Sequence, residues 1–291
     1  MGRAGGAPPF GTGGIMTAAA VPAGTSGGRP RDAARRVRIY GWRVTLLVAV
    51  IALWQAASLL KGMTFYISSP SAIWARELQW IADGTLLFHT TITLEETVAG
   101  FVLGAVAGIV AGFVIGPQRD VGEVLDPFII ALYAIPKVAL APLFIVWFGI
   151  GIWMKIILAM VTVFFIVFFN TVAGVRNVDP DLVNAVWLMG GSAREILFKV
   201  IVPHALSAAL TGVRIAIPYA LIGAIVGELI ASNRGIGYLV SSAASQFDTA
   251  GVFAALIVLT ILATVLNSLV NVVDRRTSRW KVDADLSLRP N

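Results

Sequence analysis

Six long apolar stretches constrain the fold of this chain more than any other feature. A helix that crosses the hydrocarbon core of a bilayer needs about 20 mostly apolar residues. The stretches that qualify lie at about 44–60, 97–116, 127–148, 152–170, 209–231 and 251–273. Only 13% of the 291 residues are charged, about half the share in soluble domains. We therefore predict an all-α membrane protein with six transmembrane helices.

The placement of lysine and arginine predicts the orientation of these spans. If both termini lie inside, the inside segments hold 16 of these residues and the outside segments hold 4. Such an excess marks the cytoplasmic side, so the expected topology is N-in/C-in in a bacterial inner membrane. Because the basic clusters flank apolar spans, membrane lipids are expected partners and nucleic acid is not.

The segments that flank the predicted membrane domain, 44–273, differ from it in composition. Segment 1–43 is expected to be cytoplasmic. Its residues 1–28 are rich in Gly, Ala and Pro, and we expect them to be disordered because they offer little apolar surface to bury; an Arg-rich stretch follows. Segment 274–291 is expected to be a cytoplasmic basic tail. A cleaved signal peptide is disfavoured because no small-x-small cleavage site follows the first apolar run.

The chain lacks the residue patterns of an enzyme or a metalloprotein. It has no cysteine, and His89 and His204 lie far apart, so no metal site is expected. No Gly-x-x-x-x-Gly-Lys-Ser/Thr phosphate loop occurs, so the chain is not expected to hydrolyse ATP. No Gly-x-Ser-x-Gly occurs, and Ser192 and His204 both fall in a loop. We predict a transport protein with no catalytic residue and no cofactor of its own.

A stripe of glycines runs along the second predicted span. The glycines recur every four residues: Gly100, Gly104, Gly108, Gly112 and Gly116. Residues at this spacing share one helix face, and small residues let another helix approach closely. Two interpretations are open, packing within the subunit and a dimer or gating seam.

Prolines and ionisable residues inside the spans mark candidate positions on a translocation pathway. Pro136 and Pro142 remove backbone donors from the third span, and irregular backbone at membrane depth needs protein or a water-filled cavity around it. Lys137 lies about 15 Å deep, so it either lines a pathway or snorkels to the headgroups. Glu228, near the outer end of the fifth span, either helps gate the outer mouth or hydrogen-bonds to the following loop. As the only acidic residue well inside a span, it offers little for an ion-coupled carrier.

The inside segment 171–208 is predicted to fold as helix, Gly-Gly corner, helix. Asp179 can cap a helix that starts at Pro180, and Gly190-Gly191 can end it in the left-handed conformation. The stretch Ser192-Ala193-Arg194-Glu195 has the spacing of a capping box. The second helix that it starts is expected to stop at Pro203, the next proline.

The first of these two helices has no polar face. Three side chains are expected to pack inward: Leu182, Val186 and Met189. Val183 and Trp187, four residues apart, then point elsewhere. A cytoplasmic helix that is apolar on both faces implies a protein partner on one of them, and burial under the membrane surface is the alternative.

The loop resembles the signature of the permease subunits of bacterial ABC importers. That signature is Glu-Ala-Ala, three residues, Gly, nine residues, Ile, one residue, Leu-Pro. The spacing agrees at Asn184, Ala185, Val186, Gly190, Val200, Val202 and Pro203. Asn184 stands where the family has Glu, and Val186 stands where it has the second Ala.

Other stretches resemble one branch of these permeases, the nitrate/sulfonate/taurine type. They lie at 69–74, His89 with Thr93-Leu94, 135–143, 147–151, 212–216 and 235–238, within about residues 44–281. Glu95-Glu96 is a departure, since relatives tend to have basic or polar residues there.

The resemblance implies a type I (MetI-like) ABC importer permease fold and an assembly of several chains. Expected partners are a cytoplasmic ATP-binding subunit, an extracytoplasmic binding protein and a second permease, either another copy or a paralogue. The expected solute is a small anion such as nitrate, sulfonate or taurine. The residues expected to couple to the ATPase are Val183, Asn184, Ala185, Trp187, Gly190, Gly191, Ser192 and Pro203, and those expected on the pathway are Pro136, Lys137, Pro142 and Glu228. A self-contained ion-coupled secondary transporter is the alternative.

Overall fold

The computed structural model describes residues 30–60 and 62–277, and within these ranges the chain is helical with no strand. The elements are α1 (Pro30–Ser58), α2 (Met63–Ile67), α3 (Pro70–Ala82), α4 (Thr85–Ile115), α5 (Arg119–Ala134), α6 (Lys137–Phe148), α7 (Ile152–Arg176), α8 (Pro180–Leu188), α9 (Ala193–Ile196), the π-helical turn η1 (Leu197–Ile201), α10 (Val202–Ile230), α11 (Ile236–Ser245) and α12 (Thr249–Thr277). The predicted disorder of residues 1–28 and most of the predicted tail at 274–291 lie outside the described residues.

The chain divides into two units at residue 52. The described part of the first unit is the portion of α1 from Pro30 to Ala52, so the Arg-rich stretch is helical. The unit from Leu53 onward contains the end of α1 and all other elements, including the candidate sites described below.

Five helices of the described chain are long and apolar enough to cross a membrane, namely the part of α1 from Arg38 onward, α4, α7, α10 with the elements just before it, and α12. Helices α5 and α6 pass the same test only together, and they meet at an angle of 90°. The stretch predicted as one span at 127–148 is therefore divided, and a sixth crossing exists only if the bent pair counts as one. The break falls at Ile135, which is extended (φ −62°, ψ 125°) because Pro136 follows it.

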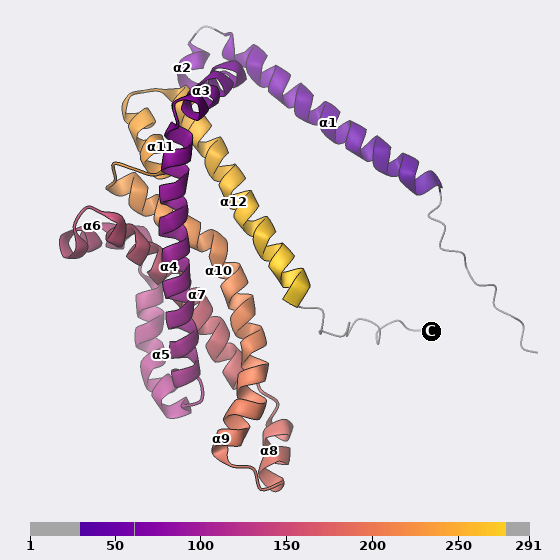
Figure 1. The fold of residues 1–291 in the computed structure, drawn as a ribbon, viewed down its shortest axis with the longest axis vertical. Helices are drawn as coiled ribbons and strands as arrows, with labels where there is room; N and C mark the ends of the chain where they lie inside the picture. The colour runs from indigo at the N-terminus through magenta and orange to yellow at the C-terminus, as the bar shows by residue number, and fades with distance from the viewer. Residues whose placement is uncertain (1–29, 61, 278–291) are drawn as a thin grey trace, which may run out of the picture. The chain divides into compact units, whose positions relative to one another are not determined.

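Helices α4, α7 and α10 form the core, and α7 packs extensively against both of the others. At its centre lies a cluster of small and branched side chains: Ala105, Val163, Val167, Ala216 and Ala220. Figure 1 shows α8 and α9 at one end of this three-helix core, and α3 and α11 at the opposite end. Helices α4 and α7 begin at the α11 end, and α10 finishes there.

The glycine stripe of α4 faces α7. A β-carbon on Gly104 would lie 2.5 Å from the carbonyl oxygen of Met160, and one on Gly108 would lie 2.8 Å from that of Phe164. The two backbones therefore meet with no room for a side chain between them. The stripe serves packing within the subunit, and the dimer-seam interpretation is not supported.

Helix α4 begins at Thr85 rather than at about residue 97. His89, Thr93 and Glu96, which precede the predicted second span at 97–116, thus lie on a membrane-spanning helix. The search for long apolar stretches missed this start, because the first turns of the helix are polar on the face that packs against α10 and α11.

Candidate functional site

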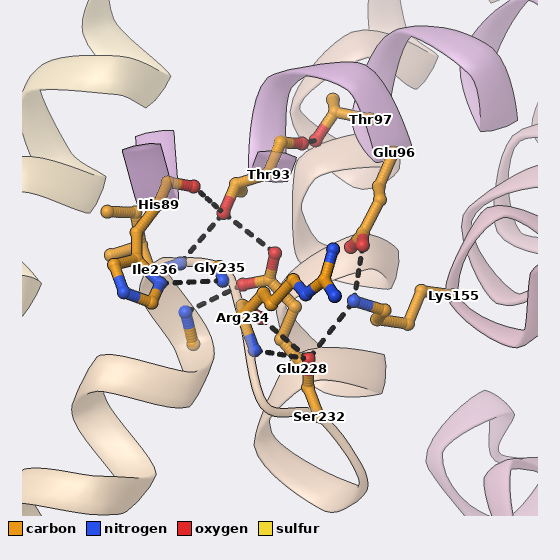
Figure 2. Close-up of polar contacts among 11 residues, drawn as sticks. His89, Thr93, Glu96, Thr97, Lys155, Glu228, Ser232, Arg234, Gly235 and Ile236 are labelled. Atoms are coloured by element: carbon orange, nitrogen blue, oxygen red, sulfur yellow. Dashed lines mark hydrogen bonds and ion pairs between the residues drawn. The ribbon is translucent and has the colours of Figure 1, made fainter. Parts of the chain in front are cut away.

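A buried polar cluster joins the three core helices at the α11 end (Figure 2). Its members are His89, Thr93, Glu96, Lys155, Glu228 and Ser232. Apart from Ser232, each is exposed by 9% or less, and Glu96 and Glu228 are exposed by 0% and 1%. Burying a charge is costly unless it is paired and hydrogen-bonded, so the partners of these groups determine whether the cluster is stable.

Lys155 of α7 connects the three segments of the cluster. Its ammonium group forms an ion pair with Glu96 of α4. It also donates a hydrogen bond of 3.0 Å to the Ser232 hydroxyl in the loop between α10 and α11. That hydroxyl donates in turn to the carbonyl of Arg234 and accepts from its N–H. One buried cation thus holds α4, α7 and the α10–α11 loop together.

Glu228 of α10 caps the start of α11. Its carboxylate accepts one hydrogen bond from the Thr93 hydroxyl (2.7 Å) and one from the Gly237 N–H (2.6 Å), while Thr93 accepts another from the Ile236 N–H (2.8 Å). The first N–H groups of a helix need partners from outside the helix, and here side chains of α4 and α10 supply them. The structural hydrogen bond considered for Glu228 is therefore present.

Gly235 is required at the turn that leads into α11. Its φ of +99° lies in the left-handed region, and a β-carbon there would overlap the Glu228 carboxylate. Its N–H donates to His89 Nδ1 at 2.9 Å, and the imidazole ring stacks on Tyr238 with centroids 5.7 Å apart.

Sequence reasoning missed the Glu96–Lys155 pair, because Lys155 was counted among the four outside basic residues and Glu96 preceded the predicted second span. The prediction that Glu228 is the only acidic residue well inside a span is also wrong, since Glu96 lies on α4 and is completely buried. One signal was available in the sequence. His89, Thr93 and Glu96 recur at i, i+4 and i+7, the spacing of one helix face.

The corner between α8 and α9 has the predicted local structure. The Asp179 side chain accepts from the Asp181 N–H at 2.9 Å, and Gly190 adopts a φ of +82°. Both bonds of the capping box between Ser192 and Glu195 are formed. These three predictions are confirmed.

Helix α8 exposes an apolar face at the far end of the core. The exposed residues of α8, with the C-cap residue Met189, are Pro180, Asp181, Leu182, Asn184, Ala185, Trp187, Leu188 and Met189. The prediction that Leu182 and Met189 pack inward is wrong, since they are 53% and 86% exposed. Val183 and Val186 are the half-buried side chains. The corner folds back over Val186, whose carbonyl accepts from the Gly191 N–H at 2.9 Å.

Pro203 does not stop the helix that begins after the corner, contrary to the prediction. The chain stays helical from Ala193 to Ile230 through the π-helical turn η1. At the end of this turn the Val202 N–H donates to the carbonyl of Leu197, five residues back. Pro203 follows directly, and the π-helical turn before it accommodates the hydrogen bond that its missing N–H removes from the helix.

Lys137 lies at the break between α5 and α6 and is half-buried. Its ammonium group donates to the carbonyl of Tyr133 at the end of α5. It also lies 4.2 Å from the centroid of the Tyr133 ring and 5.5 Å from that of Phe165. Pro136 precedes the first turn of α6, and Pro142 lies inside that helix. No interaction among the described residues joins Lys137 to Glu228.

Residues 100–279 match the family described as binding-protein-dependent transport system inner membrane component. The chain is 36% identical to the riboflavin transport system permease protein RibX of Chloroflexus aurantiacus, covering 83% of this chain and 90% of that protein. It is 31% identical to the taurine transport system permease protein TauC of Escherichia coli (81% and 88%). It is 34% identical to the putative aliphatic sulfonates transport permease protein SsuC of the same organism (84% and 92%).

Solved structures share the fold. An amino acid ABC transporter crystallised with histidines matches with a TM-score of 0.55 at 18% identity, covering 68% of this chain and 97% of that one. The MetNI methionine ABC transporter in an inward-facing conformation also matches with a TM-score of 0.55 at 18% identity, covering 69% and 98%.

The chain belongs to the binding-protein-dependent transport system inner membrane components. It has the fold of type I ABC importer permeases and is a multi-pass inner-membrane transport subunit rather than an enzyme. The family works with an ATP-binding subunit and a solute-binding protein, so the ion-coupled carrier is not favoured.

Proposed function

We propose that this permease subunit passes a small sulfonate, such as an aliphatic sulfonate or taurine, across the membrane when a separate ATP-binding subunit binds α8. The exposed apolar face of α8 beside the open corner at Gly190 carries the proposal. A contiguous exposed apolar face usually marks a protein interface. Two relatives are named as permeases for aliphatic sulfonates and taurine, which supports this class of solute.

In the proposed assembly, two copies of the chain lie in the lipid bilayer with both termini inside, and ATP binds to the partner subunits alone. The coupling residues are Val183, Asn184, Ala185, Trp187, Gly190, Gly191, Ser192 and Pro203. ATP binding closes the two ATPase subunits, draws the α8 segments together and opens the spans outward to the binding protein. Hydrolysis restores the inward-facing state.

Trp187→Asp is expected to weaken association with the ATP-binding subunit without preventing membrane insertion. Trp187 is 69% exposed and free to enter a partner's groove. Truncating a central interface tryptophan typically costs about 2 kcal/mol or more, roughly a 30-fold loss of affinity. Gly190→Arg should act similarly, because φ of +82° disfavours any side chain there. Co-purification of the two subunits after detergent extraction measures the effect.

Trp74→Asp provides the matched control, since Trp74 is 65% exposed on α3 at the opposite end of the core. It should co-purify with the ATP-binding subunit in normal amounts. Normal co-purification of Trp187→Asp would refute the docking role of α8.

Lys137→Gln is expected to lower uptake of an anionic solute at limiting concentration by roughly tenfold. The ammonium group is half-buried at the α5–α6 break, where a charge acts over several ångströms with little screening. Lys137→Arg keeps the charge and should retain most uptake. Equal uptake by the glutamine and arginine variants would contradict a role for the Lys137 charge in the pathway.

A further inference from the structure

A cavity of about 370 Å³ lies beside the buried polar cluster. Its walls come from the first half of α4, the start of α7 and the loop between α10 and α11. Both signs of charge line it, from Glu95, Glu96, Lys155 and Arg234. Its volume is within the range of pockets that hold small molecules.

The part of the cavity wall formed by Glu95 and Glu96 is acidic, and it includes a carboxylate oxygen with no hydrogen-bond donor in the part of the chain that the structure describes. Glu96 is completely buried, and its Oε1 pairs with Lys155. Its Oε2 has no hydrogen-bond partner among the described residues. A buried acceptor without a partner is destabilising, and Glu96 lines the cavity, so a cationic ligand group there would stabilise its charge. Glu95, the exposed neighbour of Glu96, adds a second carboxylate at the same wall.

The loop between α10 and α11 brings a positive group to the cavity. In Figure 2 the guanidinium group of Arg234 points toward the Glu96–Lys155 pair, and Arg234 lines the cavity. Its structural hydrogen bonds are made by its backbone. Gly151 and Ile152, at the start of the 25-residue helix α7, also line the cavity, and no side chain caps that helix. An uncapped helix start favours an anionic group.

We propose that this cavity is a subsite for a small zwitterion, with its ammonium group at Glu95 and Glu96 and its acidic group at Arg234 and the start of α7. This proposal rests on the sulfonate or taurine class of solute proposed above, and it narrows that class to solutes that also carry an ammonium group. A simple anion would meet two carboxylates with no positive group to offer them, whereas an amino acid or an aminosulfonate complements both signs of charge.

Taurine and ethanesulfonate are matched probes because they differ only in the amine. Binding of each to the purified full chain in lipid nanodiscs is measured by calorimetry, without binding protein or ATP-binding subunit. Taurine is expected to bind at least roughly tenfold more tightly than ethanesulfonate. Glu95→Gln should remove most of this preference without weakening ethanesulfonate, and Arg234→Gln should weaken both probes.

Glu123→Gln, an exposed carboxylate change on α5, is the control and should leave both affinities unchanged. Equal affinity for the two probes, no binding of taurine at about 10 mM, or a Glu95→Gln variant with unchanged preference would each overturn the proposal. The measurement needs no ATP-binding subunit. A failed α8 docking test would therefore not affect the proposed zwitterion subsite. Failure of the taurine binding test would likewise not affect the proposed docking of α8.

Discussion

Lys155→Met should lower the free energy of unfolding by about 3–5 kcal/mol, the usual cost of removing one partner from a buried ion pair. The substitution keeps the length of the side chain but leaves Glu96, which is exposed by 0%, without its paired cation. It also removes the bond to Ser232 that fastens the α10–α11 loop to α7. Titration of the purified protein with sodium dodecyl sulfate in mixed micelles, followed by circular dichroism, measures the change.

Two controls separate loss of the pair from loss of the side chain. Adding Glu96→Gln to Lys155→Met should recover part of the loss, because the double variant no longer buries that carboxylate unpaired. Lys199→Met breaks the exposed pair with Glu195 and should cost about 0.5 kcal/mol or less. A Lys155→Met variant within about 1 kcal/mol of the parent protein would contradict the structural role of the cluster.

Gly104→Leu is expected to lower the free energy of unfolding by about 3 kcal/mol, the upper end of the usual cost of overpacking. The β-carbon alone would lie 2.5 Å from the Met160 carbonyl and 2.8 Å from the Val163 β-carbon. Neither atom can move unless α4 and α7 separate. The same detergent titration measures the change, and Gly104→Ala should fall between the parent protein and the leucine variant.

Val106→Leu is the control for this substitution, because Val106 is 57% exposed on the same helix. It should change stability by about 0.5 kcal/mol at most. If leucine at position 104 were tolerated as well as leucine at position 106, the close approach of α4 to α7 would be wrong.

The parts of the fold that were predictable from sequence depend on neighbouring residues. The Asp179 cap, the Gly190 turn and the Ser192–Glu195 capping box each involve groups within a few positions of one another. The six apolar stretches were recognisable for the same reason, since each is a local property of composition.

The missed parts depend on contacts between distant residues. Thr93 and Glu228, which together cap α11, are 135 positions apart. His89, Thr93 and the 235–238 stretch were each recognised as family features, but only the fold shows that they bond to one another. Pro136 and Pro203 were visible in the sequence, but the 90° angle between α5 and α6 and the π-helical turn before Pro203 were not predictable from these local patterns.

Helix α7 is a long, uninterrupted helix that connects the buried polar cluster to the α8 segment. It runs for 25 residues without a proline, about 38 Å at 1.5 Å per residue. Lys155 lies near its first turn and the α8 segment follows its last. A tilt of about 5° about one tip displaces the other by about 3 Å over that length, comparable to the span of a salt bridge. If the proposed docking moves α8, α7 would carry a displacement of this size to its other end, where Lys155 lies.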